Sequence, residues 1–146
     1  MLGVRRRDDD VDLVLTSDLH RAVRTTDIAF GGTGIPVVKD PRLRECDYGS
    51  LTGGPVTGIR PSIAFLDEQF PDGESYRDVC RRTADVLAEL AVRPDLARVL
   101  IVAHSAQRWA LRALLGGEDL ADVLSSPDPW QPGWEYVVSA GWHWEA

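Results

Sequence analysis

Cysteine is scarce in this chain of 146 residues, which has two, Cys46 and Cys80. Their spacing matches neither a disulfide framework nor a zinc knuckle, so we expect no metal and a cytoplasmic protein in a reducing compartment. An apolar stretch of signal-peptide length is missing from the start, which is a basic run followed by an acidic one. No segment approaches the length of a membrane span, and we therefore expect no membrane partner.

Lysine is nearly missing as well, since Lys39 is the only one among 16 basic residues. With 23 acidic residues the formal net charge is −7 and the sequence pI is about 4.9. This acidic balance argues against nucleic acid as a partner, because nucleic acid requires a basic face. A small site can still gather a few arginines around an anionic substrate, and arginine suits phosphate well.

What the chain does contain is ordinary for a soluble globular protein, with 44% hydrophobic and 27% charged residues. This length allows one domain with a real core, so we expect a single domain over residues 1–146. Repeats, low-complexity tracts and interdomain linkers are not evident in the sequence. The sequence therefore predicts one folding unit.

Apolar runs alternate with helical periodicity along the chain. The runs predict strands over 11–15, 35–38, 99–103 and 135–139, with the third as a buried central strand. The periodicity predicts helices over 19–30, 62–70, 75–93, 106–115 and 119–124, the first capped by Ser17 or Asp18 and the third by a Ser75–Asp78 capping box. This order is typical of an α/β fold with a mostly parallel sheet, in which ligands bind beyond the carboxyl ends of strands.

Three polar residues are candidates for chemistry. Arg21 lies about one helical turn after the first strand, where a guanidinium beside helix N–H groups makes an anion site. His104 directly follows the strand ending at Ala103 and could act as an acid, a base or a phosphate partner. Glu45 lies in a glycine-rich segment and could protonate a leaving group. Each also has an ordinary interpretation, as a surface arginine, a structural histidine and a solvated glutamate.

Four segments strengthen the functional interpretation, TSDLHRA followed by Thr25, then LRECDYGSLTG, FPDGESYRDV and VLIVAHS. In order and approximate spacing they resemble the histidine phosphatases, which are phosphoglycerate mutase-like, from about Val11 to Val138. The resemblance implies a three-layer α/β/α sandwich with a mostly parallel sheet. It also implies hydrolysis of a phosphate monoester through a phosphohistidine, with a small phosphorylated substrate and no cofactor or metal.

The same resemblance assigns roles to the three candidates. Arg21 matches an arginine that binds the phosphoryl oxygens, and His104 matches the second histidine of the family, which shares that task. Glu45 matches the acid thought to protonate the departing oxygen. By this resemblance the catalytic residues are Glu45 and His104, and the phosphate-binding residues are Arg21 and His104.

The chain departs from the family at its start, where the family has a strand ending in Arg-His-Gly that carries the nucleophile. The histidines here are His20, His104 and His143, and none stands in such a motif. We therefore expect an N-terminally truncated domain that lacks its first βα unit and is catalytically impaired. We also expect uncovered sheet edges and a marginal monomer, unless Met1–Val4 or another chain, as in a homodimer, fills the gap.

Two alternatives remain open at this point. A pseudophosphatase would keep Arg21 and His104 and bind a phosphorylated ligand or partner without turnover. An α/β-hydrolase would use Ser105 as nucleophile, because it lies between a strand and a helix, with His143 as the base. The sequence around Ser105 lacks both glycines of a nucleophile elbow, which argues against this second alternative.

Overall fold

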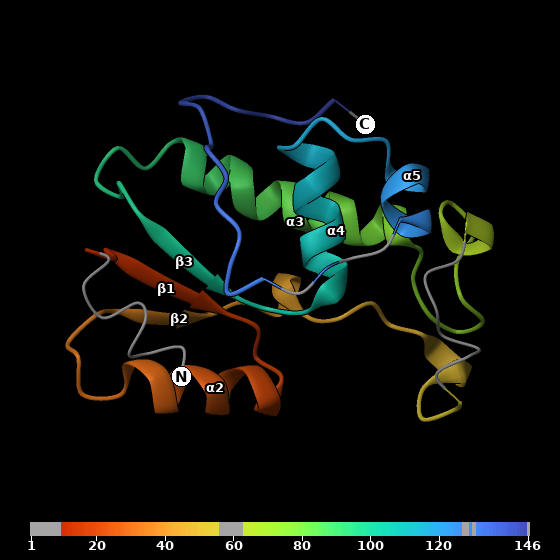
Figure 1. Ribbon diagram of the computed structural model, residues 1–146, viewed down its shortest axis with the longest axis horizontal. Helices are drawn as coiled ribbons and strands as arrows, with labels where there is room; N and C mark the ends of the chain where they lie inside the picture. Colours follow the sequence, from red (N-terminus) through yellow and green to blue (C-terminus); the bar gives the residue numbers. More distant parts are fainter. Residues whose placement is uncertain (1–9, 56–62, 127–128, 130, 146) are drawn as a thin grey trace.

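A computed structural model describes residues 10–55, 63–126, 129 and 131–145 of the chain. Its sheet contains three strands, β1 (Leu13–Thr16), β2 (Val37–Lys39) and β3 (Val99–Val102). All pair in parallel in the order β2-β1-β3 (Figure 1). The α-helices are α2 (His20–Phe30), α3 (Tyr76–Ala91), α4 (Ser105–Leu114) and α5 (Leu120–Ser125), and the short 3₁₀ turns are η1 (Pro41–Leu43), η2 (Gly49–Leu51) and η4 (Ile63–Phe65).

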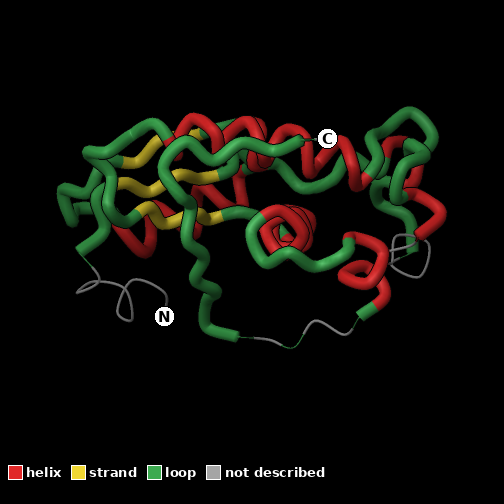
Figure 2. The backbone as a smooth tube through the Cα atoms, turned by 90° about the horizontal axis from the view of Figure 1, so that it is seen from above, coloured by secondary structure: helices red, strands yellow, loops and turns green. Residues whose placement is uncertain are grey.

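Helices cover the two faces of the sheet. In Figure 1, α2 lies below the strands and α3 and α4 lie above them, while Figure 2 shows the three strands side by side between these helices. Alternate residues of β1 serve the two faces, as the pleat of a strand requires. Thr16 accepts a hydrogen bond from Thr26 of α2, and Leu15 packs in one cluster with Val86 of α3. The expected α/β/α layering is therefore present.

Helix α3 begins where the sequence predicts. The Ser75 hydroxyl accepts the N–H of Asp78, and the Asp78 carboxylate accepts the N–H of Ser75, which completes a capping box. The apolar side of α3 contributes Val79, Val86 and Leu87 to the core, each at most 2% exposed. This long, well-anchored helix supports the loop that faces the strand ends.

Two segments pack closely at the end of the molecule away from the sheet, 47–49 and 71–73. Gly49 has a φ of 52°, and a Cβ there would lie 2.0 Å from the Pro71 carbonyl oxygen. A Cβ on Gly73 would likewise lie 2.3 Å from the carbonyl oxygen of Asp47. Only glycine allows this approach of two main chains, which fixes the course of the chain just after Glu45.

Several predicted elements are corrected by the structure. The strongest apolar run, β3, is an outer strand of the described sheet rather than a central one, and its four side chains are all partly exposed. No strand forms over 135–139, and the predicted helix over 62–70 is reduced to η4 where it is described. The N-cap of α2 is Leu19, not Ser17 or Asp18. Met1–Val4, predicted to fill a gap in the sheet, lie outside the described residues.

No helix among the described residues is long and apolar enough to cross a membrane. In Figure 1, residues 131–145 run upward past the strands and then across the top of the molecule above α3. This segment is attached there by the N–H of Gly141, which donates to the carbonyl oxygen of Ala91, and by the Arg108 guanidinium, which lies 3.7 Å from the centre of the Trp134 ring.

Candidate phosphoryl-binding site

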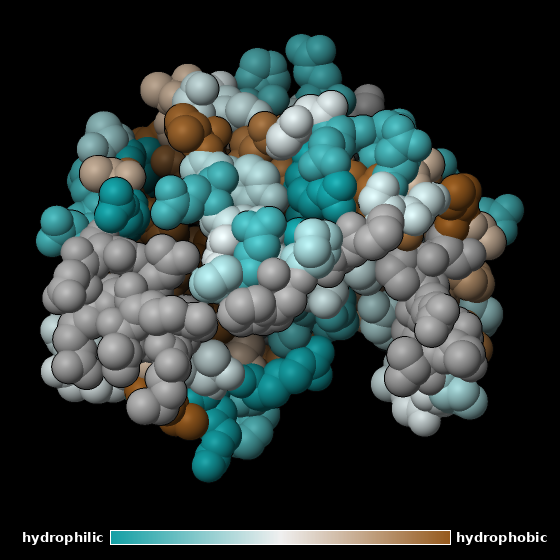
Figure 3. All heavy atoms as spheres, viewed as in Figure 1, coloured by the Kyte–Doolittle hydropathy of each residue, from teal (hydrophilic) through white to brown (hydrophobic). Residues whose placement is uncertain are grey.

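A pocket of about 380 Å³ opens at the carboxyl ends of β1 and β3. We call it the strand-end pocket. Its lining residues come from the start of α2, the loop after η1 and the junction of β3 with α4: Arg21, Ala22, Thr25, Glu45, Val102, Ala103, His104 and Ser105. Figure 3 shows a notch in the lower edge of this face of the molecule. The three candidates Arg21, Glu45 and His104 thus share one pocket.

Each ring nitrogen of His104 takes part in one hydrogen bond. Arg21 Nε donates to His104 Nδ1 over 3.1 Å, and His104 Nε2 lies 2.9 Å from Ser17 Oγ. Desolvation of the half-buried ring lowers the pKa of His104, and the neighbouring charge of Arg21 lowers it further. The imidazole is therefore neutral at physiological pH.

Arg21 is exposed on the first turn of α2 and is the cation available to a ligand. Its Nε bonds to His104, which leaves the two Nη groups for other contacts. Nearby arginines are held by carboxylates: Arg44 by Asp18, Arg42 by Asp40 and Glu89, and Arg82 by Glu74. Among the described residues Arg21 has no acidic partner, so no described carboxylate neutralises its charge.

Glu45 faces the start of α4. Its Oε1 accepts the N–H of Ala106 over 3.1 Å and the N–H of Cys46 over 3.0 Å. A carboxylate is favourable at this place, because unpaired N–H groups and the helix dipole give the beginning of a helix a partial positive charge. These two bonds hold one oxygen of Glu45 beside His104, which precedes α4.

The loop that carries Glu45 is held from α3 by Arg82, a residue that the sequence did not single out. Arg82 pairs with both carboxylate oxygens of Glu74 and donates to the carbonyl oxygens of Arg42 and Glu45. From α4, Gln107 donates to the carbonyl oxygen of Arg44. These contacts join residues far apart in the sequence, so local patterns gave no signal for them.

The other candidate residues lie elsewhere or lack partners. Ser105 lines the pocket, but the ring of His143 contacts Glu145 and the carbonyl oxygen of Gly141 instead. His20 is exposed on α2 and does not line the pocket. No cluster of three metal-ligating side chains occurs within the described part of the chain. The described lining of the pocket thus combines the guanidinium of Arg21, the neutral imidazole of His104 and the carboxylate of Glu45.

Comparison with known proteins places the chain in a family. The family model of the histidine phosphatase superfamily (branch 1) matches residues 1–127. A 2,3-bisphosphoglycerate-dependent phosphoglycerate mutase of Cytophaga hutchinsonii is 34% identical over 138 residues, covering 83% of this chain and 64% of that protein. A probable phosphoglycerate mutase GpmB of Yersinia enterocolitica is 29% identical over 126 residues, covering 80% of this chain and 59% of that protein. The chain thus spans less than two thirds of the length of these curated relatives.

Solved structures agree with the sequence comparison. Bacillus stearothermophilus YhfR aligns with a TM-score of 0.73 and 27% identity, over 90% of this chain and 69% of that one. A mycobacterial glucosyl-3-phosphoglycerate phosphatase, in complex with inorganic phosphate, aligns with a TM-score of 0.69 and 28% identity, over 85% of this chain and 68% of that one. The fold and the match over most of the sequence show that the chain belongs to the histidine phosphatase superfamily (branch 1).

Proposed function

We propose that the strand-end pocket binds the phosphoryl group of a small phosphate monoester, and that this 146-residue chain hydrolyses such esters weakly or not at all. The single observation that supports the binding part is the Arg21–His104 pair, in which Arg21 Nε donates to a neutral imidazole. This contact orients the guanidinium while its two Nη groups remain for the oxygens of an anion. A phosphatase of similar structure, named above, is known in complex with inorganic phosphate.

Turnover in this family depends on a nucleophilic histidine, and the pocket holds one histidine only. Both ring nitrogens of His104 are already bonded, to Arg21 and to Ser17. A nitrogen that accepts a hydrogen bond from an arginine cannot attack phosphorus while that bond is kept, because the bond uses its lone pair. The impaired activity that we propose therefore concerns the covalent step, not the recognition of the phosphoryl group.

Glu45 is proposed to act on the leaving group. Its Oε1 is held by the two N–H groups of Cys46 and Ala106, at the side of the pocket next to Ser105. A carboxyl group in this position can donate a proton to a departing ester oxygen. In a chain without turnover the same group would limit which ligands fit, because an ionised Glu45 repels a second anionic group.

A second candidate function is that of a pseudophosphatase, which binds a phosphorylated ligand or partner and does not turn it over. Two observations favour it: no described carboxylate pairs with Arg21, and both ring nitrogens of His104 are already hydrogen-bonded. The two functions share the recognition of a phosphoryl group and differ only in turnover.

The test is hydrolysis of p-nitrophenyl phosphate by the 146-residue chain from acidic to neutral pH, with His104→Ala assayed in parallel. We expect release of nitrophenol to be slow at most. Slow release that is lost in His104→Ala identifies an impaired phosphatase, whereas release no faster than with His104→Ala, together with calorimetric binding of inorganic phosphate, identifies a pseudophosphatase. Rapid turnover that disappears in His104→Ala would contradict the impairment, and absence of phosphate binding would contradict the whole proposal.

A further inference from the structure

Ser17 is a wholly buried polar residue at the point where β1 leaves the sheet. Its exposed fraction is 0%, and it is not among the residues that line the strand-end pocket. Its hydroxyl accepts the N–H of Leu19 over 3.2 Å and lies 2.9 Å from Nε2 of His104. Burying a hydroxyl costs free energy unless it is hydrogen-bonded, so these two contacts stabilise Ser17 in its buried position.

The backbone of Ser17 is fixed to the strand that presents the histidine. Its N–H donates to the carbonyl oxygen of Val102 over 3.0 Å, and its own carbonyl oxygen accepts the Thr16 hydroxyl. Because Val102 stands two residues before His104, the main chain sets the distance between the hydroxyl and the imidazole. Little freedom remains for the Ser17 side chain to move away.

The hydrogen bonds of His104 define its tautomer. An arginine side chain has only donors, so His104 Nδ1 must accept from Arg21 and cannot carry a proton. The single proton of the neutral ring is therefore on Nε2, and it points at Ser17 Oγ. Ser17 Oγ then accepts two hydrogen bonds, one from the N–H of Leu19 and one from the Nε2–H of His104.

We propose that Ser17 is a positioning residue, which fixes the tautomer and ring orientation of His104 and, through His104, directs the guanidinium of Arg21 at a bound phosphoryl group. The last part rests on the proposed function, whereas the first part concerns the imidazole alone. Ser17 touches no ligand in this scheme. It acts in the way that outer partners of metal-binding histidines act, by holding the second ring nitrogen.

The electrostatics of the pocket agree with this assignment. The lowered pKa of His104 has desolvation as its main cause and Arg21 as the next, and Glu45 and Arg82 act on the ring with opposite signs. A protonated His104 would put a proton on Nδ1, facing Nε–H of Arg21, and break the contact that orients the guanidinium. A neutral ring whose proton is on Nε2, facing Ser17, therefore keeps Arg21 in place.

Nitrogen-15 NMR of the histidine side chains tests the proposal directly, because the chain has only His20, His104 and His143. In the unchanged chain near neutral pH we expect one histidine with a pyrrole-type Nε2, a pyridine-type Nδ1 and an Nε2–H proton protected from exchange with water. The signal is assigned by its loss in His104→Gln. A pyrrole-type Nδ1 for His104 would overturn the proposal.

Ser17→Ala is the decisive variant, and Thr26→Val is its matched control. Thr26 is also buried, at 1% exposure, and its hydroxyl bonds to Thr16 and the Ala22 carbonyl oxygen without contacting His104. In Ser17→Ala we expect the protected Nε2–H signal to vanish and phosphate to bind about fivefold more weakly. In Thr26→Val both should be retained, although both variants lose one buried hydroxyl.

The outcomes separate this proposal from the function on which part of it rests. If the unchanged chain does not bind inorganic phosphate, the proposed function fails, and the spectra of His104 alone decide the role of Ser17. If Ser17→Ala keeps the protected Nε2–H signal, Ser17 does not position the ring. If Ser17→Ala loses the signal but binds phosphate as tightly as the unchanged chain, the proposed direction of Arg21 is wrong. The amide spectrum of each variant reports whether it is folded.

Discussion

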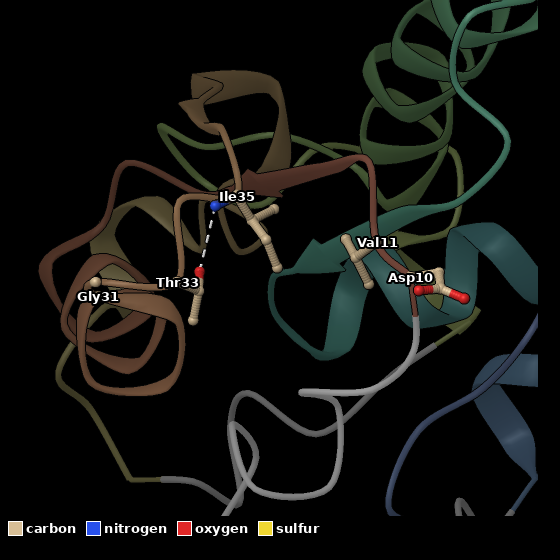
Figure 4. A pocket seen from close by; sticks show the side chains of 6 residues that line it. Asp10, Val11, Gly31, Thr33 and Ile35 are labelled. Carbon is tan, nitrogen blue, oxygen red and sulfur yellow. Dashed lines mark hydrogen bonds between the residues drawn. The ribbon is translucent and has the colours of Figure 1, made fainter.

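Two pockets lie at opposite ends of the same sheet, and they differ in chemistry more than in size. The strand-end pocket measures about 380 Å³, whereas a second pocket, the far pocket, measures about 530 Å³. The far pocket is lined by residues that precede the strands and follow α2: Asp10, Val11, Gly31, Gly32, Thr33 and Ile35. Figure 4 shows the Thr33 hydroxyl bonded to the N–H of Ile35.

The smaller pocket holds the reactive groups, and the larger one does not. Among the described residues that line the far pocket, Asp10 is the charged one, and the Thr33 hydroxyl already donates to the Phe30 carbonyl oxygen. The strand-end pocket combines Arg21, Glu45 and His104. In a parallel sheet the carboxyl end of each strand leads to the start of a helix, where free N–H groups attract anions. The strand-end pocket lies at this end of the sheet and the far pocket at the other, which explains why their chemistry differs. Volume is thus a poor guide to function here.

The largest effect expected on ligand binding is the loss of phosphate affinity in Arg21→Met. Removing the unpaired guanidinium should weaken binding at least about tenfold, because a charge-assisted contact to the anion disappears. Thr33→Ala, in the far pocket, should bind phosphate as the unchanged chain does. Calorimetric titration with inorganic phosphate measures both, and equal affinities for the two variants would remove the distinction between the pockets.

A second contrast concerns two glycines, Gly49 in the closely packed 47–49 segment and Gly32 in the far pocket. Gly49→Ala should lower the free energy of unfolding by about 3 kcal/mol or more, since its Cβ would overlap the main chain of Pro71 at a positive φ. Gly32→Ala should cost only about 1 kcal/mol, because its φ is 79° but no atom lies within 4 Å of the added Cβ. Urea denaturation of the two variants compares them. Similar losses would mean that the 47–49 and 71–73 segments are not tightly packed.

The contacts by which Arg82 holds the loop that carries Glu45 provide a third test. Arg82→Gln should lower the free energy of unfolding by about 2 kcal/mol, because Glu74 and two loop carbonyl oxygens lose their charged partner. The control is Arg93→Gln, which breaks only an exposed pair with Asp95 and should leave the melting temperature nearly unchanged. Calorimetry of both proteins is the measurement. An Arg82→Gln protein as stable as the control would show that the contacts of Arg82 do not contribute to the stability of the fold.

The smallest expected effect is a pH dependence. Burial and Arg21 keep the pKa of His104 in the folded chain below the value of 6.5 that an unperturbed histidine has. Between those two pKa values the unfolded chain binds more protons, so His104 contributes a loss of stability as pH falls below 6.5. Urea midpoints at about pH 7.5 and about pH 5.5 should therefore differ less in His104→Gln than in the unchanged chain.

His143→Gln is the control for this pH effect. The His143 side chain is 73% exposed in the C-terminal segment. Its removal should leave the difference between the two urea midpoints as it is in the unchanged chain. If His104→Gln behaves in the same way as His143→Gln, the imidazole in the strand-end pocket does not carry the predicted linkage.

Local signals predicted the elements that local interactions build. The Ser75–Asp78 box marked the start of α3, and the apolar run before Thr16 marked β1. The meeting of Arg21 and His104 followed from the rule that parallel strands end at one edge. Glu45 joined them through the resemblance of its segment to the histidine phosphatases.

The expectations that failed depended on the neighbours of a segment. The composition of β3 matches a central strand, but its place at the edge depends on which strands pair, and composition does not encode pairing. The apolar residues around Val137 matched a strand, yet no strand forms there, and Val137 is 85% exposed. Arg82 and Ser17 were missed because their partners are distant in sequence.

The central claim is that a phosphoryl group binds at the carboxyl ends of β1 and β3. The most direct test is a titration of the ¹⁵N-labelled chain with inorganic phosphate, followed by amide NMR. We expect saturable shifts at Arg21, Thr25, His104 and Ser105, and none at Gly31–Ile35 beside the far pocket. Shifts confined to the far pocket, or no saturable shift at all, would contradict the account.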